Sequence, residues 1–230
     1  MLKYFFLILY NFADNLIHQT RIVNFLKDKN VKFIVDIGAH KGEFLKKIKS
    51  ITSVKRTYSV EPQKKIFNLL KKQIDNKFSF AHNLAISNKR GIAKLEINDF
   101  TMTSTFSKVN KKSRYFKIKN LIFGNKQKLY EIVKTETLDQ YINRTKLKKI
   151  HLLKIDTEGH ELTVVKSGPK TLKKVQYLLI EFRKNDMYAD YSSLKLHNFL
   201  IKKNFTLLKS FKFPLFGMED RVYKNLKCKI

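Results

Sequence analysis

Residues 31 to 42 read VKFIVDIGAHKG, and they predict the first unit of the fold. Residues 31 to 37 are mostly apolar and rich in β-branched side chains, so they predict a buried strand that ends at Gly38. A helix is expected from Glu43 onward. The turn carries Asp36, Gly38 and Gly42 in the pattern D-x-G-x-x-x-G, where glycines let the backbone approach a ligand. Dinucleotide-binding folds have G-x-G-x-x-G here instead, to receive a pyrophosphate.

Outward from this unit, short β-rich runs alternate with helical periodicity, which indicates an α/β protein with a doubly wound, mostly parallel sheet. We expect further strands at 56–60, 78–87, 91–97, 150–155, 175–182, 205–211 and 221–227. Helices are expected at 63–74, 138–142, 161–166 and 192–202. The 91–97 strand is expected to form a hairpin-like excursion with the preceding strand, and the last two strands an antiparallel pair. Residues 99 to 128 lose periodicity and predict a long loop.

The first 30 residues are expected to be an amphipathic helical extension on a domain of residues 31 to 230. Apolar side chains recur at helical spacing through residues 2 to 28, which predicts one or two helices that pack on the domain. The apolar run 4 to 10 is far shorter than the roughly 18 residues of a membrane span. A peripheral membrane anchor is the alternative interpretation of this segment.

The composition favours a globular chain and leaves its charge open to two explanations. The 230 residues carry a net charge of +29 and are 43% hydrophobic, so a sizeable core is available. Lysine supplies most of the positive charge and is scattered, whereas bidentate phosphate and base recognition favours arginine. Biased genome composition explains the many lysines without any nucleic-acid partner. We therefore regard a nucleic-acid partner as unlikely. The single cysteine, Cys228, excludes an intrachain disulfide and suits the cytoplasm.

Glu61 ends the second predicted strand, 25 positions after Asp36. An acidic side chain there can accept hydrogen bonds from the ribose hydroxyls of an adenosine. S-adenosylmethionine has no phosphate but carries an amino group and a sulfonium, so an aspartate beside the glycine turn suits it. Separately, each feature has a simpler explanation: Asp36 as a cap of the turn, and Glu61 as an acid favoured by the dipole of the next helix.

The strand at 150–155 is followed by several ionisable residues, Lys154, Asp156, Glu158 and His160. Alternation along a strand predicts that Lys154, Asp156 and Glu158 point together. Such groups are costly to desolvate unless they act together. A carboxylate or the imidazole can serve as general base for an acceptor hydroxyl, with Lys154 steadying the developing oxyanion. A divalent metal bound by Asp156 and Glu158 is an alternative means of lowering the hydroxyl pKa.

These residues resemble the FkbM family of methyltransferases. The resemblance spans roughly residues 31 to 183 and rests on VDIGAHKG at 35–42, VEP at 60–62, HNLAIS at 82–87, TLD at 137–139 and LLKIDTEGHE at 152–161. The last motif is the most specific. The chain departs from the family pattern at Thr157, where valine is usual, and at His40, where a small residue or asparagine is common.

The resemblance implies a seven-stranded class I methyltransferase fold, with S-adenosylmethionine as cofactor and an oxygen as the methyl acceptor. It implies that the cofactor contacts Asp36, Gly38, Ala39, Gly42 and Glu61, with Asn83 and Ala85 near the adenine. Residues 103–105 resemble the serine-containing loop near the acceptor pocket of the family.

We therefore expect an S-adenosylmethionine-dependent O-methyltransferase that acts on a sugar, a surface glycan or a small natural product. The alternatives are an RNA methyltransferase, and a non-catalytic module that binds a polyanion or an anionic membrane. A cytoplasmic location is expected, with peripheral contact at the inner face of the membrane as an option. The sequence leaves the acceptor, the metal requirement and the oligomeric state open.

Overall fold

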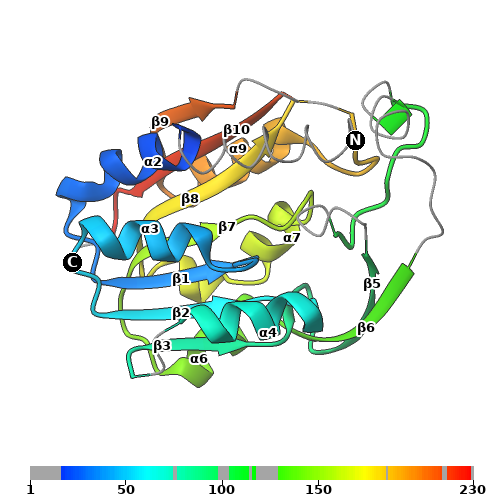
Figure 1. Cartoon of the computed structure of the whole chain (residues 1–230). Helices are drawn as coiled ribbons and strands as arrows, with labels where there is room; N and C mark the ends of the chain where they lie inside the picture. The colour runs from blue at the N-terminus through cyan, green and yellow to red at the C-terminus, as the bar shows by residue number, and fades with distance from the viewer. Residues whose placement is uncertain are drawn as a thin grey trace.

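The computed structural model describes residues 17–74, 77–97, 104–113, 116–117, 129–184, 186–213 and 217–228. Its main sheet has seven strands in the order β3-β2-β1-β7-β8-β10-β9 (Figure 1). The strands β3, β2, β1, β7 and β8 run parallel, whereas β10 is antiparallel to β8 and β9. Their bounds are β1 (Phe33–Ile37), β2 (Arg56–Val60), β3 (Ser79–His82), β7 (Ile150–Ile155), β8 (Val175–Arg183), β9 (Phe205–Lys212) and β10 (Met218–Asn225). The predicted mostly parallel sheet is confirmed.

Helices cover both faces of this sheet, because the central strands are apolar on both sides. One face packs against α2 (Gln19–Leu26), which continues into the short η2 (Lys27–Lys29), and against α3 (Glu43–Ile51). The other packs against α6 (Leu138–Thr145), α7 (Glu161–Lys166), α8 (Pro169–Leu172) and α9 (Ser193–Lys202). Within β7, Leu152 packs in the core on the α2 and α3 face, and Leu153 packs in the core on the opposite face. The helix α4 (Lys64–Gln73) lies beside α3 in Figure 1.

A second, three-stranded sheet corrects two of the predicted pairings. The predicted strand 78–87 is divided between β3 in the main sheet and β4 (Ala85–Ile86) in the second sheet. The division falls at Asn83, whose side-chain amide donates to the carbonyl oxygens of Glu61 and Pro62 at 3.0 and 2.8 Å. The strand β6 (Leu129–Glu136) lies between β4 and β5 (Gly91–Ile97), so β5 does not form a hairpin with β4.

The described part of the N-terminal segment is an integral layer of the core. Ile22, Val23 and Leu26 of α2 are buried and pack with Phe44 and Ile48 of α3. Residues 1 to 16, which contain most of the predicted extension, lie outside the described residues. Among the described helices, none combines the length and the apolar character that crossing a membrane requires.

Candidate functional site at the carboxyl edge of the sheet

Gly38 allows three strand ends to meet at one point. Its φ of +81° is in the left-handed region, and a Cβ atom there would overlap the carbonyl oxygen of Asp156. The amides of Gly38 and Ala39 donate to the carbonyl of Val60 at 2.9 and 3.0 Å, and the amide of Asp156 donates to the carbonyl of Ile37 at 3.0 Å. The carboxyl ends of β1, β2 and β7 are thereby joined behind a side-chain-free turn.

Glu61 points into this turn. Its Oε2 accepts a hydrogen bond from the amide of His40 at 3.0 Å, and its Oε1 accepts one from the amide of Gln63 at 2.9 Å. Burial raises the pKa of Glu61 to about 7, although these amides and His40 oppose that shift. A carboxylate oxygen can accept more than one hydrogen bond, so the described contacts leave acceptor capacity for hydroxyl donors.

Asp36 and Lys154 form a buried ion pair across β1 and β7. They are direct partners in the parallel register, and the ammonium of Lys154 lies 3.4 Å from Oδ1 of Asp36 and 3.3 Å from Oδ2 of Asp156. Burial raises the pKa of Asp36, against the attraction of Lys154. For Lys154, burial lowers the pKa, but Asp36 and Asp156 outweigh it, so the pKa is raised and the ammonium stays charged. Because Asp36 is fully buried, it acts on the site through Lys154 in this conformation.

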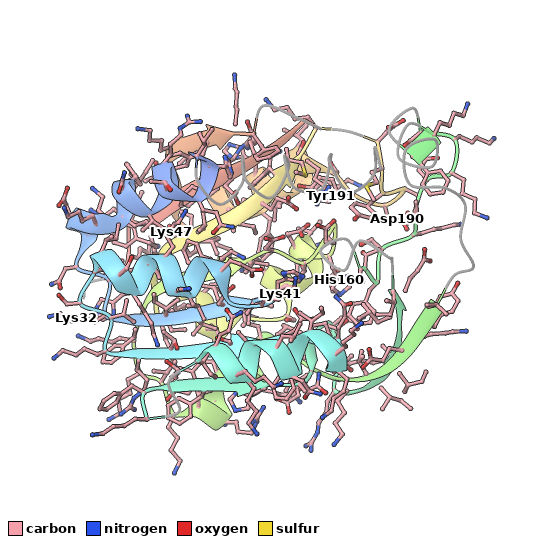
Figure 2. The ribbon with its side chains drawn as sticks, viewed as in Figure 1. Lys32, Lys41, Lys47, His160, Asp190 and Tyr191 are labelled. Carbon is pink, nitrogen blue, oxygen red and sulfur yellow. The ribbon has the colours of Figure 1, made fainter. Side chains whose placement is uncertain are left out.

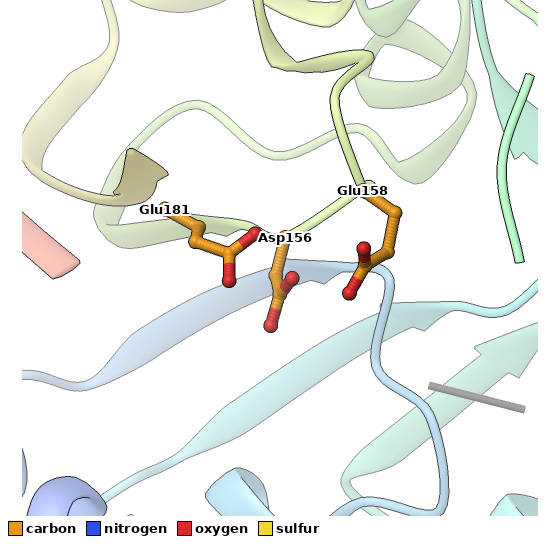
Figure 3. Close-up of side chains that lie close together, drawn as sticks. All are labelled: Asp156, Glu158 and Glu181. Atoms are coloured by element: carbon orange, nitrogen blue, oxygen red, sulfur yellow. The ribbon is translucent and has the colours of Figure 1, made fainter. Parts of the chain in front are cut away.

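Three carboxylates, those of Asp156, Glu158 and Glu181, gather beside this pair, with oxygen atoms within 4.8 Å of one another. Figure 3 shows Asp156 between the other two. The guanidinium of Arg183 lies 2.6 Å from Glu158 and 2.8 Å from Glu181, and the hydroxyl of Tyr188 donates to Glu158 at 2.7 Å. Burial raises the pKa of Glu181 well above its ordinary value, against the attraction of Arg183.

The number and spacing of these oxygens suit a divalent ion, but each carboxylate already faces a cation of the protein itself. Arg183 is paired with Glu158 and Glu181, and Lys154 is paired with Asp156. The residues therefore fit a cluster held by the protein's own cations better than a resident metal site, although Lys154 and Arg183 balance only part of the charge of the four carboxylates that include Asp36. Metal binding by Asp156 and Glu158 stays a prediction, and no step proposed below depends on it.

Lys154 and Asp156 lie together as the strand alternation predicts, but Glu158 joins them for a different reason. The strand β7 ends at Ile155, and Glu158 has a left-handed backbone with φ of +56°. Its carbonyl accepts a hydrogen bond from the buried hydroxyl of Thr105 at 2.6 Å. Glu161 stabilises the same loop, because its Oε1 accepts hydrogen bonds from the amides of Thr157 and Gly159 at 3.0 and 3.1 Å. Local backbone geometry directs Glu158 toward Arg183.

His160 stands where the edge meets a pocket. Its Nε2 lies 3.1 Å from the hydroxyl of Ser87, and its ring packs on Phe106 with a centroid distance of 5.4 Å. Burial lowers the pKa of His160 to about 4, so the imidazole is neutral at physiological pH.

The pocket has a volume of about 270 Å³. Its lining combines three aromatic rings, several hydroxyls, one carboxylate and one ammonium, from Phe106, Ser107, Lys108, Gly159, His160, Leu162, Thr163, Asp190, Tyr191 and Ser192. Figure 2 shows His160, Asp190 and Tyr191 on the side of the molecule toward which the parallel strands point.

The FkbM methyltransferase domain model matches residues 36 to 207, which is most of the chain. The chain belongs to the FkbM methyltransferase family. The predicted family and the class I fold are thereby confirmed, and the family is one of methyltransferases, which is the predicted enzyme class.

Solved structures of methyltransferases share the fold at low sequence identity. An FkbM methyltransferase from Methylobacillus flagellatus is 16% identical with a TM-score of 0.55, and the match covers 85% of this chain. TrmK of M. capricolum, solved with S-adenosyl-homocysteine, is 10% identical with a TM-score of 0.52, covering 90% of this chain and 68% of TrmK. This chain spans 44% of the Methylobacillus protein. No curated protein sequence matches it significantly.

The remaining residues that the FkbM resemblance singled out lie near this edge in different roles. Asn83 ties the β3–β4 connection to the end of β2, and Ala85 is the buried first residue of β4. Thr105 is buried against the Glu158 loop, whereas Thr103 lies outside the described residues. Their contacts with a cofactor or an acceptor stay predictions.

The sequence interpretation missed Glu181, Arg183 and Tyr188. Glu181 and Arg183 end the apolar strand β8, which neighbours β7, so they reach the same edge as Asp156. The signal was available: charged residues at the carboxyl end of a buried parallel strand were interpreted for β1, β2 and β7 but not for β8. Tyr188 follows β8 in an irregular segment and had no such signal.

Proposed function

We propose that this FkbM-family protein transfers a methyl group from S-adenosylmethionine to a hydroxyl of a sugar, a surface glycan or a small natural product. The observation that carries the proposal is the direction of Glu61. Its carboxylate points at the Gly38 turn, where it is hydrogen bonded to the amide of His40. A carboxylate beside a side-chain-free turn supports an adenosyl site, because it can accept ribose hydroxyls while the backbone stays close.

The cofactor site that this arrangement supports extends from Gly38, Ala39 and Gly42 to Glu61, with Asn83 and Ala85 behind it. S-adenosylmethionine supplies an activated methyl group for an in-line displacement. Glu61 would bind the ribose, and Asp36 would hold Lys154 and its positive charge at the edge. The fixed backbone of the three joined strand ends would keep this geometry constant.

Asp156 is the general base that the contacts favour. Its side chain is 38% exposed, whereas Glu158 is held by Arg183 and Tyr188. Asp156 would take the proton of the acceptor hydroxyl while the acceptor oxygen forms its bond to the methyl carbon and the carbon–sulfur bond breaks. Lys154 would stabilise the negative charge that develops on the acceptor oxygen. His160 is the second candidate base: its imidazole is neutral and can accept a proton, but its lowered pKa makes it a weak base.

The pocket beside His160 supports a small hydroxylated acceptor. Hydroxyls of Ser107, Thr163 and Ser192 and the carboxylate of Asp190 can exchange hydrogen bonds with sugar hydroxyls, and aromatic rings offer apolar contact. An RNA acceptor is the second candidate, favoured by the net charge of +29.

The cofactor half of the proposal is tested by isothermal titration with S-adenosylmethionine. Asp36→Ala and Glu61→Ala should weaken binding by at least tenfold, whereas Asp156→Asn should leave most of the binding intact. Absence of binding to the wild-type protein at high micromolar concentration would contradict the proposal and favour a non-catalytic module.

The acceptor half is tested by mass spectrometry for the gain of one methyl group across sugars, lipid-linked glycans and RNA. Asp156→Asn should abolish turnover on the acceptor found, and an unchanged rate would exclude Asp156 as the base. A chelator in a parallel reaction should leave turnover unchanged; loss of turnover that added magnesium restores would assign a metal to the carboxylate cluster. Methylation of RNA alone would establish the second candidate.

A further inference from the structure

Strands β5 and β6 pair antiparallel over residues 91–97 and 129–135, and we name this pair the β5–β6 ribbon. Its inner face contains Leu95 and Val133, which are buried against Ala85. Its outer face carries no described cover. Ile92 is 76% exposed, Ile132 66% and Tyr130 46%, and alternation places all three on this face. Exposed aliphatic side chains gathered on one strand pair indicate an interaction surface.

The same face is basic. Lys134 lies opposite Ile92, and Lys94 lies opposite Ile132, so lysines and isoleucines alternate across the two strands. The ammonium of Lys94 also lies 4.2 Å from the centroid of the Tyr130 ring. Lys89 and Arg90 extend the positive charge into the exposed turn before β5.

The ribbon carries one acidic residue on each face. Glu131 is on the inner face, where its Oε1 accepts the amide of Lys64 at 2.9 Å. Glu96 lies opposite Tyr130 and is therefore on the outer face, where it is half-buried beside its bridge to Thr105 and is outnumbered by Lys94 and Lys134. The described outer face therefore combines aliphatic side chains with a net positive charge.

We propose that the outer face of the β5–β6 ribbon docks on an anionic lipid bilayer. Isoleucine and tyrosine side chains can insert at the boundary of headgroups and acyl chains, while lysine and arginine attract acidic headgroups. A second copy of the chain fits poorly, because two copies of this basic face would repel each other. Single-stranded RNA fits less well, because branched aliphatic side chains offer no flat surface on which bases stack.

The ribbon is connected to the candidate acceptor pocket. The bridge between Glu96 and Thr105 joins β5 to the loop that lines the pocket, and Ser87, next to β4, contacts His160. Figure 1 shows the ribbon on the side toward which β1 and β2 point. Docking through the ribbon would bring the candidate acceptor pocket toward the bilayer, which suits an acceptor carried on a lipid. That consequence rests on the proposed function; the docking itself does not.

The test is co-sedimentation of the full chain with vesicles of phosphatidylcholine mixed with phosphatidylglycerol. We expect binding to the mixed vesicles, weaker binding at higher salt, and none to pure phosphatidylcholine. Lys94→Glu/Lys134→Glu should weaken partitioning by about thirtyfold or more, since each lysine near an anionic surface contributes about fivefold. Ile92→Ser/Ile132→Ser should weaken it by about tenfold or more, because the insertion of apolar side chains is lost.

Matched control pairs lie away from the ribbon. Lys195→Glu/Lys202→Glu on α9 changes the net charge by the same amount, and Leu194→Ser/Leu226→Ser removes two leucines that are each 67% exposed. Both control pairs should bind vesicles within about twofold of the wild type. All variants should keep a single cooperative thermal unfolding transition and the affinity for S-adenosylmethionine.

Three results would overturn the docking proposal. One is no binding to mixed vesicles, and another is an equal loss in the control pairs. The third is full binding by the isoleucine variant together with displacement by polyuridylate, which would indicate a general polyanion surface. Because titration with S-adenosylmethionine is measured separately, failure of vesicle binding is distinguishable from failure of the proposed methyl transfer.

Discussion

At the scale of single residues, Gly38 decides whether the three strand ends can meet. Gly38→Ala would place a methyl group on the carbonyl oxygen of Asp156 and force an alanine to a φ of +81°. We expect a loss of about 3 kcal/mol or more in the free energy of unfolding, from the left-handed backbone and from overpacking together. Urea unfolding measures it, and binding of S-adenosylmethionine should be lost as well.

Gly42→Ala is the matched control for this substitution. Gly42 has a similar φ of +88°, but its added methyl group would meet only the flexible end of Leu70, at 2.9 Å. We expect about 1–2 kcal/mol, which is the backbone contribution alone. Equal losses in the two variants would show that the contact with Asp156 does not restrict Gly38.

From the raised pKa of Glu61 we predict that cofactor affinity depends on pH. Its pKa is raised to about 7, whereas hydrogen bonds from ribose hydroxyls favour the carboxylate. Binding should therefore release a proton below pH 7, and the dissociation constant should rise about tenfold for each pH unit below that value. Isothermal titration from pH 5 to 8 measures this slope. Glu61→Gln should remove this part of the slope while the ligand's own titration remains, so identical slopes would contradict the assignment.

Sequence alone could predict the site residues that lie at the ends of strands, but not those that tertiary contacts bring to the site. Asp36, Glu61 and Asp156 each terminate or follow a buried parallel strand, so sequence alone brought them to one edge. The partners that decide their chemistry are set by tertiary geometry. Arg183 pairs with Glu158 only because Glu158 has a left-handed backbone, and Tyr188 reaches it from an irregular segment.

At the scale of elements, a substitution in α2 can test whether the described N-terminal segment stabilises the domain. Leu26 is fully buried and packs in the core between α2, α3 and the sheet. Leu26→Ala should lower the free energy of unfolding by about 2–5 kcal/mol, as expected for a buried leucine. Leu194→Ala, at a position that is 67% exposed, should change it by no more than about 0.5 kcal/mol. A small effect at Leu26 would show that α2 is a dispensable attachment.

Elements with a strong apolar period were predicted closely, and those fixed by long-range pairing were not. The strands 56–60 and 150–155 and the helix 161–166 have the predicted bounds. The second sheet was missed because β4 has only two residues, and β6 reaches β5 across residues 98 to 128. The local periodicity of a sequence cannot predict a pairing between such distant strands.

At the scale of the whole molecule, acidic and basic groups are unevenly distributed. The chain has 48 lysines and arginines against 19 aspartates and glutamates. The carboxylates at the edge of the sheet include six that are mostly buried or half-buried, those of Asp36, Glu61, Asp156, Glu158, Glu161 and Glu181. The proposed cofactor site would therefore place a cationic sulfonium in an acidic interior, and the basic exterior would attract an anionic partner.

The excess of positive charge also predicts how stability responds to salt. Repulsion among unpaired surface lysines destabilises the compact state, and salt screens charges that are farther apart than about 10 Å at 0.1 M. The melting temperature should therefore rise by several degrees between low salt and 0.5 M sodium chloride, since about 1 kcal/mol corresponds to roughly 2–4 °C for a chain of this size. Lys195→Glu/Lys202→Glu should raise the melting temperature at low salt and reduce its increase with salt. A melting temperature that falls with salt would show instead that attractive ion pairs outweigh the repulsion of the net charge of +29.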